Sequence, residues 1–451
     1  MAHNCLEESS RHAEIEDPSI PLVTSMESKL KGLHPLSSEY CIYRVPKKLH
    51  QINEAAYTPL RVSIGPFHHG RKGLEAMEDH KWRYLQNFLQ STKKGMAEFV
   101  KLIKNNEGKV RQCYAETIDF HSDKFVEIIL VDAVFIIGVL LRHSLPYLAD
   151  ENDRIFGKSW RMISDIKRDL MLLENQLPFF ILEDLFEEVT LQSQYESLSM
   201  IKLTHNFYKD SVELEENLRS TNSTEVKHFI DFLRSCLNPS KPRTEPQRGK
   251  IVKDIHLRCA TELIEAGVKF MVCSNKNFFD IKFENGILKI PHFVVTDETE
   301  SLLRNILAFE QCHYEAGYIS DYVAFMDSLI NTRKDVELLV GKKVIGHWLG
   351  DSEDVSTLFN KLGKEIMLDS NEFYFSRLQE DLDDYCNSNW HKWKANLKRD
   401  HLRTPWKEDI KREAVEFFQE LFSSTRSYTQ GQGEVKGNFE GSLEFQKISK
   451  A

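Results

Sequence analysis

The sequence predicts a mainly α fold, with one large helical domain that carries a small antiparallel β-hairpin. Apolar residues recur at helical spacing over long stretches in both halves of the chain, and the clearest alternation surrounds Asn285 and Gly286. The 451 residues are 41% hydrophobic and 11% aromatic, which is enough for a sizeable core. With 20 Gly and 13 Pro, the composition excludes collagen-like and low-complexity chains.

The N-terminal residues 1–39 are acidic and polar, and we expect them to form a partly disordered arm. Within the arm, apolar residues at helical spacing predict one helix over residues 19–30. Residues 41–73 contain a high density of helix-breaking residues, namely Pro46, Pro59, Gly65, Pro66, Gly70 and Gly73. These Pro and Gly residues exclude long helices and predict an extended loop.

Four helices are predicted in the rest of the first half. The segment 75–88 is amphipathic, whereas 124–143 is apolar on nearly every side and must therefore lie in the core. A third helix is expected over 161–174. Pro178 fits the first turn of a fourth helix over 179–188, because its missing N–H needs no partner there.

The middle of the chain contains a linker and a hairpin. Residues 238–250 hold three Pro and four Lys or Arg, a composition that sustains neither a helix nor a core. A helix over 254–266 follows, with Gly267 at the position of a left-handed C-cap. Alternation over 280–290, divided by Asn285-Gly286, predicts a hairpin with a type I′ turn.

The remaining elements are helices and a tail. Helical patterns cover residues 298–313, 319–331, 335–340 and 376–398. Residues 423–451 are rich in Ser, Gly, Lys and Gln, and we expect them to be disordered. We interpret residues 40–422 as a single domain that includes the Pro-rich linker, because neither half alone can cover its very apolar helices.

Charge, cysteine spacing and hydropathy limit the partners and the compartment. The chain has 59 Lys and Arg against 69 Asp and Glu, a net charge of −10 that argues against nucleic acid as the default partner, although a local basic patch is allowed. The eight cysteines are widely spaced, so we expect reduced thiols. An acidic N-terminus is unlike a signal peptide, and residues 125–141 include Glu127 and Asp132, so no transmembrane helix is predicted. We expect a cytoplasmic protein.

Three histidines form the first candidate site. His68 and His69 lie on a Gly- and Pro-rich loop, and His80 lies on the helix that follows. With Glu78 or Asp79 they could suggest a metal cluster, but the spacing is unlike any standard zinc motif. We therefore favour a structural role in which the imidazoles bond to loop backbone, and we predict no metal.

Two polar clusters lie in apolar surroundings. The triplet Glu174, Asn175 and Gln176 precedes Pro178, and it is either buried and fully hydrogen-bonded or the site of an acid with a raised pKa. We favour bracing of the turn between two helices. Asp132 lies among apolar residues of the core helix, where an unpaired carboxylate costs several kcal/mol. A basic or hydrogen-bonding partner is therefore expected for Asp132.

Signals of catalysis are weak. Cys312 and His313 follow Glu310, but neighbours on a helix point about 100° apart and cannot share a proton directly. The sequence contains no nucleophile elbow, phosphate loop, dinucleotide fingerprint or HExxH motif. We therefore predict no catalytic residue and no cofactor.

Residues 390–413 combine Trp390, Trp393 and Trp406 with eight basic and four acidic residues. A basic, Trp-rich segment in an acidic protein is typical of contact with an anionic membrane surface, here through residues 390–422. The alternative is a helix whose tryptophans pack inward while its lysines are solvated.

Several motifs occur in order along the chain: Val45-Pro46, Gly65-Pro66-Phe67-His68-His69-Gly70, Met77-Glu78-x-His80-Lys81, Leu173-Glu174-Asn175-Gln176-Leu177-Pro178, Ala266-Gly267-Val268 and Ala308-Phe309-Glu310-Gln311-Cys312. Together they resemble the plant family catalogued as domain of unknown function 247, over roughly residues 41–406. The resemblance marks His68, His69, His80, Glu174, Asn175, Gln176 and Glu310 as a candidate cluster.

The resemblance implies a mainly helical plant protein without established enzymatic activity, usually fixed to a membrane by one C-terminal span. Some grass members are linked to self-incompatibility, which favours recognition or signalling over metabolism. This chain departs from the pattern after Pro405-Trp406, where Glu413, Glu416 and Glu420 interrupt the apolar stretch. We therefore expect any membrane contact to be peripheral, the alternative being the membrane location that the resemblance implies.

The predicted function is a non-enzymatic interaction or signalling protein with a protein partner. The alternative is a hydrolase or transferase with a site around Glu174, His68 and His69. That alternative requires the two segments to converge on one pocket.

Overall fold

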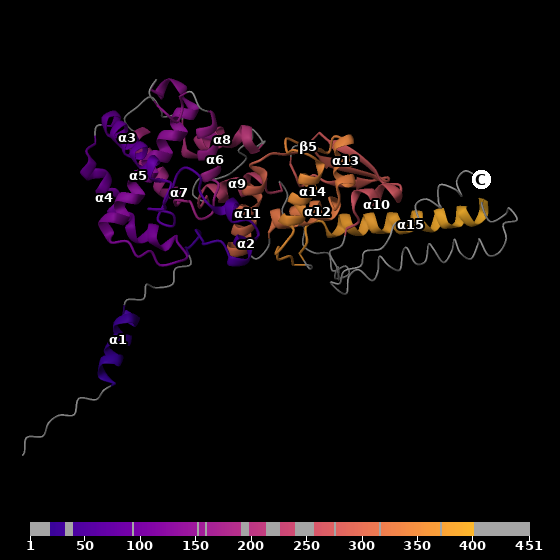
Figure 1. The fold of residues 1–451 in the computed structure, drawn as a ribbon, viewed down its shortest axis with the longest axis horizontal. Helices are drawn as coiled ribbons and strands as arrows, with labels where there is room; N and C mark the ends of the chain where they lie inside the picture. The colour runs from indigo at the N-terminus through magenta and orange to yellow at the C-terminus, as the bar shows by residue number, and fades with distance from the viewer. Residues whose placement is uncertain are drawn as a thin grey trace, which may run out of the picture. The chain divides into compact units, whose positions relative to one another are not determined.

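The computed structural model of the chain describes residues 19–31, 39–92, 94–150, 153–157, 160–190, 198–212, 226–239, 257–274, 277–314, 317–369 and 372–400 (Figure 1). Regular structure in these residues is mainly helical, with short strands in two small sheets, so the predicted fold class is confirmed. Most of the predicted arm and linker, and all of the predicted tail, lie outside the described residues.

The first half is helical, and its elements are α1 (Ile20–Lys31), α2 (Lys47–Ile52), η1 (Glu54–Tyr57), α3 (Glu75–Ser91), α4 (Met96–Gln112), α5 (Ser122–Ser144), η2 (Pro146–Leu148), α6 (Trp160–Asp169), α7 (Phe179–Thr190), α8 (Met200–Val212) and α9 (Phe229–Leu237). Helix α5 confirms the predicted core helix, because it packs against α3, α4, α7 and α8 (Figure 1). A helix that is apolar on nearly all sides needs neighbours on all sides.

Helices α4, α8 and α9 were not predicted, and two predicted segments of the first half differ from the structure. The loop before α3 contains two short helices, α2 between Pro46 and Asn53 and η1 between Asn53 and Thr58. Helix α6 ends at Asp169 rather than near Glu174, because side chains replace the helical backbone bonds. Asn175 donates to the carbonyl of Asp169, and Gln176 donates to carbonyls of the same turn.

The described residues after the linker contain five short strands: β1 (Lys269–Cys273), β2 (Lys282–Glu284), β3 (Ile287–Pro291), β4 (Phe293–Val295) and β5 (Ile345–His347). Strands β2 and β3 pair antiparallel around Asn285 (φ 52°) and Gly286 (φ 77°), which confirms the predicted hairpin and the positive φ angles of its turn. The sequence did not predict that β1 joins β3 in parallel, or that β4 and β5 form a second parallel pair.

The helices of the second half are α10 (Ala260–Glu265), α11 (Thr299–His313), α12 (Tyr318–Leu329), α13 (Arg333–Gly341), α14 (Ser352–Leu362) and α15 (Ser376–Asp400). Helix α11 packs against both η1 and α9 of the first half and against α12 and α14 of the second. Its buried Asn305 donates to Ala56 O at 2.9 Å and accepts from Leu173 N at 2.8 Å. The two sides of the linker therefore share core contacts.

The chain divides into one compact unit through Asp381 and a second that begins at Leu382. The single domain over residues 40–422 stays a prediction. No helix within the described residues has both the length and the apolar character that crossing a bilayer requires.

Candidate functional site

A buried carboxylate at the end of α6 shapes the loop that carries His68. Asp169 accepts hydrogen bonds at 2.6 to 2.9 Å from the backbone N–H groups of Leu60, Arg61 and Val62. Burial raises the pKa of Asp169 to about 6, although these three donors and Arg168 act in the opposite direction. One side chain thus satisfies three consecutive loop donors.

Asn175 and Gln176 extend this bracing. Asn175 Oδ1 accepts from Ile64 N at 2.7 Å, and its Nδ2 donates to the carbonyls of Val62 and Asp169 at 3.0 Å each. Gln176 Nε2 donates to the carbonyls of Leu170 and Leu172 at 2.8 and 2.7 Å, while its Oε1 accepts from Phe229 N. Both amides are fully bonded, which confirms the interpretation that the triplet braces the turn between α6 and α7.

A buried ion pair holds the start of the motif Gly65 to Gly70. Lys81 Nζ lies 2.6 Å from Asp132 Oδ1, and Asp132 Oδ2 accepts from Gly65 N at 2.8 Å. The ammonium also bonds to Ser63 O and Glu78. The predicted partner of Asp132 is therefore confirmed, and it is Lys81, on the helix that also carries His80.

Gly65 cannot be replaced without moving the turn. It has a φ of +69°, and an added Cβ would lie 2.8 Å from Gln176 O and 2.9 Å from the hydroxyl of Tyr114. Only a residue without a side chain tolerates both this backbone conformation and this approach. The loop therefore packs directly against the 174–176 turn.

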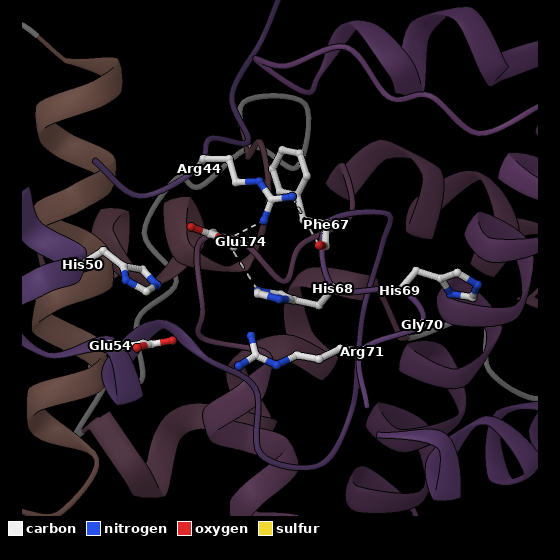
Figure 2. A pocket seen from close by; sticks show the side chains of 9 residues that line it. All are labelled: Arg44, His50, Glu54, Phe67, His68, His69, Gly70, Arg71 and Glu174. Carbon is white, nitrogen blue, oxygen red and sulfur yellow. Dashed lines mark hydrogen bonds and ion pairs between the residues drawn. The ribbon is translucent and has the colours of Figure 1, made fainter. Parts of the chain in front are cut away.

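Glu174 occupies the point where these segments meet. Its Oε1 accepts from Val45 N at 2.8 Å, and its Oε2 accepts from Arg44 Nη1 at 2.9 Å. His68 Nε2 lies 3.6 Å from the same Oε2, too far for a hydrogen bond, and it has no other hydrogen-bond partner among the described residues (Figure 2). Glu174 thus joins the N-terminal segment to the turn after α6 and faces a buried imidazole.

These side chains line an open hollow of about 470 Å³, formed by Arg44, His50, Glu54, Phe67, His68, His69, Gly70, Arg71 and Glu174 (Figure 2). Arg44 stacks on the Phe67 ring, with 4.3 Å between the guanidinium carbon and the ring centroid, and also pairs with Glu116. Arg71 and Glu54 are exposed. Within the described part of the chain neither has an ion-pair partner of its own.

Two histidines of the hollow, His68 and His69, are held neutral. Burial and, to a smaller extent, the nearby cations Arg44 and Arg71 lower the pKa of His68 to about 4. The pKa of His69 is also lowered, mainly by burial, and its ring packs edge-on against Phe120. At neutral pH both imidazoles therefore serve as neutral hydrogen-bonding groups.

The lining of the hollow offers a proton acceptor and a cation. The lining residues include no Ser, Thr or Cys nucleophile, and both Glu174 oxygens already accept hydrogen bonds. A neutral His68 beside Glu174 could accept a proton, whereas the exposed Arg71 offers five N–H donors to an anion. The described residues contain no group of three His, Cys, Asp or Glu that could hold a metal ion.

The structure brings together only part of the predicted cluster. His68, His69 and Glu174 line the hollow, whereas Asn175 and Gln176 support it from the buried side. His80 on α3 is not among the lining residues.

Glu310 on α11 lies in a different setting. It pairs with Arg234 at 3.0 Å and accepts from the backbone and hydroxyl of Ser320 at 2.8 and 2.9 Å. Its bonds join α9, α11 and the start of α12. The side chains of Trp390 and Trp393, and all of Trp406, lie outside what the structure describes.

Sequence reasoning missed four lining residues: Arg44, His50, Glu54 and Arg71. Single polar residues in loops and short helices have no periodicity or spacing that marks a site. The one available signal for Arg44 is its position directly before Val45-Pro46, at the start of the recognised motifs.

Comparison with known proteins gives one family and two similar sequences. The family described as "Plant protein of unknown function", domain of unknown function 247, matches residues 42–408. The UPF0481 protein At3g47200 of Arabidopsis thaliana is 29% identical over 392 residues, covering 81% of each chain. The putative UPF0481 protein At3g02645 of Arabidopsis thaliana is 22% identical, covering 77% of this chain and 82% of its own. No solved structure matches.

Proposed function

Because the chain belongs to the plant family of domain of unknown function 247, we propose that it is a non-enzymatic interaction protein in recognition or signalling. Its hollow binds an anionic group, a carboxylate or a phosphate, on a protein partner. The observation that carries this proposal is the exposed Arg71 beside the buried Nε2 of His68, since neither group has a side-chain partner among the described residues.

The charged residues of the hollow differ in whether they are already paired, and this difference supports a binding role. Arg44 is occupied by Glu174 and Glu116, so it stiffens the wall of the hollow. Arg71 remains available for two parallel hydrogen bonds to a carboxylate or phosphate. Glu54, also at the hollow, supplies an acceptor for an N–H group next to that anion. An acidic peptide segment presents both a carboxylate for Arg71 and a backbone N–H for Glu54.

Arg71→Ala is expected to weaken capture of a partner from plant tissue by about 10-fold to 100-fold, because a hydrogen bond to a charged group contributes about 1.5 to 3 kcal/mol. The full-length protein, immobilised, is compared with Arg71→Ala and with the matched control Arg83→Ala, an exposed arginine on α3. Inorganic phosphate added to the wash should compete with capture by the wild type.

The control is expected to capture the same partner as the wild type. Equal capture by Arg71→Ala and the wild type contradicts the anion site. Finding no specific partner, together with turnover of a small molecule that a change at Glu174 abolishes, contradicts the interaction role itself.

One observation favours an enzyme as the second candidate. Two segments far apart in sequence place His68 and Glu174 in one hollow, with 3.6 Å between Nε2 and Oε2 and with the imidazole neutral at pH 7. A hydrolase or transferase would use His68 as a general base that Glu174 orients. Glu174→Gln tests this candidate, because the amide oxygen can still accept from Val45 N while the charge is lost.

We also propose that the protein is cytoplasmic and that any membrane contact is peripheral, through residues 390–422. Basic residues near an anionic surface contribute about 1 kcal/mol each, and that attraction weakens with salt. We expect a high-salt or alkaline wash to release the protein from plant membranes. Full retention in an alkaline-washed pellet contradicts the peripheral location, and a lack of binding to anionic vesicles at low salt contradicts membrane contact.

A further inference from the structure

Cys41 and Cys113 lie next to one another although they are far apart in sequence. Cys41 N and Ile42 N both donate to Cys113 O, at 2.8 and 2.9 Å, and Ile42 pairs with Tyr114 in a parallel β-bridge. Paired strands lie about 4.8 Å apart, which falls within the roughly 4.4 to 6.8 Å between Cα atoms that a disulfide requires. The thiol of Cys113 donates to the carbonyl of Lys109, near the end of α4, at 3.3 Å.

We propose that Cys41 and Cys113 form a reversible disulfide when the chain meets a small-molecule disulfide such as oxidised glutathione. Seven cysteines are described, and all are free thiols in this structure. The pair is therefore the dithiol form of the proposed site.

The two thiols have different chemical roles. The neighbouring Cys41 is the main reason that the pKa of Cys113 is lowered, and the positive charge of Lys109 acts in the same direction. The same contact and burial raise the pKa of Cys41. Cys113 is also the more accessible residue, at 7% exposure against 2% for Cys41. Cys113 is thus the attacking thiolate and Cys41 the resolving thiol.

The reaction balances with one small disulfide. The Cys113 thiolate attacks one sulfur of that disulfide, forms a mixed disulfide and expels a small thiolate. Cys41 then loses its proton and attacks Sγ of Cys113, which forms the protein disulfide and expels the second small thiolate. Two protons and two electrons pass from the protein to the small disulfide, which becomes two thiols.

Other cysteines lack these features. Burial raises the pKa of Cys236 to about 12 and the pKa of Cys312 to about 11, so both remain protonated and unreactive at neutral pH. The proposed bond would link Cys41 to Cys113, which directly follows α4. Cys41 precedes Arg44, in the wall of the hollow, by three residues. Closing so long a loop restricts the unfolded chain, so the oxidised form should melt at a higher temperature.

The test uses the reduced full-length protein, treated with oxidised glutathione, alkylated with iodoacetamide and analysed by mass spectrometry of intact protein and peptides. The wild type should lose two hydrogens and yield a cross-linked peptide that joins Cys41 to Cys113. Its Tm should rise by several degrees and return to the starting value with dithiothreitol. Cys41→Ser should stop with glutathione bound to Cys113, whereas Cys113→Ser should leave Cys41 unmodified.

Cys236→Ser is the matched control, because it removes a partly buried thiol outside the pair and should oxidise as the wild type does. The proposal is overturned if the folded wild type yields no cross-linked peptide. It is also overturned if the same linkage forms only after unfolding in urea. These readings do not depend on any partner, so they are separate from the test of Arg71.

Discussion

Lys81→Met is expected to destabilise the folded chain by about 3 to 5 kcal/mol, because it leaves a buried carboxylate without its counter-charge. Asp132 is 2% exposed, and its remaining bonded donor is Gly65 N. Burial opposes a charge on Lys81, but Asp132 and Glu78 overcome that effect and raise the pKa of Lys81. The pair is therefore charged in the folded protein, and each member depends on the other.

The stability lost in Lys81→Met should depend on pH. Burial raises the pKa of Asp132 to about 6, against the attraction of Lys81, whereas a carboxyl in an unfolded chain titrates near about 4. The folded state therefore binds more protons between these values, and this group's contribution to stability falls as pH rises through that window. Without Lys81 the pKa of the buried Asp132 should rise further, because the attraction that lowers it is lost. Lys81→Met should therefore lose more stability, relative to the wild type, at pH 8 than at pH 5.

Urea unfolding followed by circular dichroism measures the effect. Lys104→Met is the matched control, because Lys104 forms a comparable pair with Asp123 at 2.7 Å that is exposed to solvent. The control should change stability little, since exposed ion pairs are screened by water and salt. Similar losses of unfolding free energy in both variants would contradict a larger contribution from the buried pair.

How much the sequence could predict depends on the range of the interactions. The core helix α5 and the hairpin at Asn285-Gly286 depend on local periodicity and on turn chemistry, and both were predicted. The parallel pairing of β1 with β3 and of β4 with β5 depends on the path of the chain between strands, and β5 has only three residues. Such pairings have no local sequence pattern.

The same distinction applies to the site. The burial of Asp132 among apolar residues predicted that a partner exists, but only the packing of α3 against α5 selects Lys81. The Glu174 triplet was recognisable as polar residues in an apolar segment. The hollow itself could not be predicted, because Arg44 reaches Glu174 through a tertiary contact and the lining residues come from separate segments of the chain.

Asn175→Asp is expected to destabilise the protein by about 3 to 5 kcal/mol at neutral pH, although the two side chains have nearly the same shape. Asn175 is 0% exposed, and its Nδ2 donates to the carbonyls of Val62 and Asp169. In the variant an oxygen would face both carbonyls, so two hydrogen bonds would become repulsive contacts. The bond from Ile64 N would remain, which isolates the effect of the lost donor.

Protonation should partly rescue this variant, because a neutral carboxylic acid can donate to one of the two carbonyls. Burial and the two carbonyls both raise the pKa of the new acid in the folded state, so the variant should gain stability relative to wild type as pH falls. Asn360→Asp is the control, since Asn360 Nδ2 donates to Asn331 O at 3.1 Å at an exposed position where water can replace the bond. Urea unfolding of both variants at pH 5 and pH 8 separates the outcomes. A loss for Asn175→Asp that matches the control, or that does not change with pH, contradicts the role of Asn175 as the buried link between the His68 loop and the turn after α6.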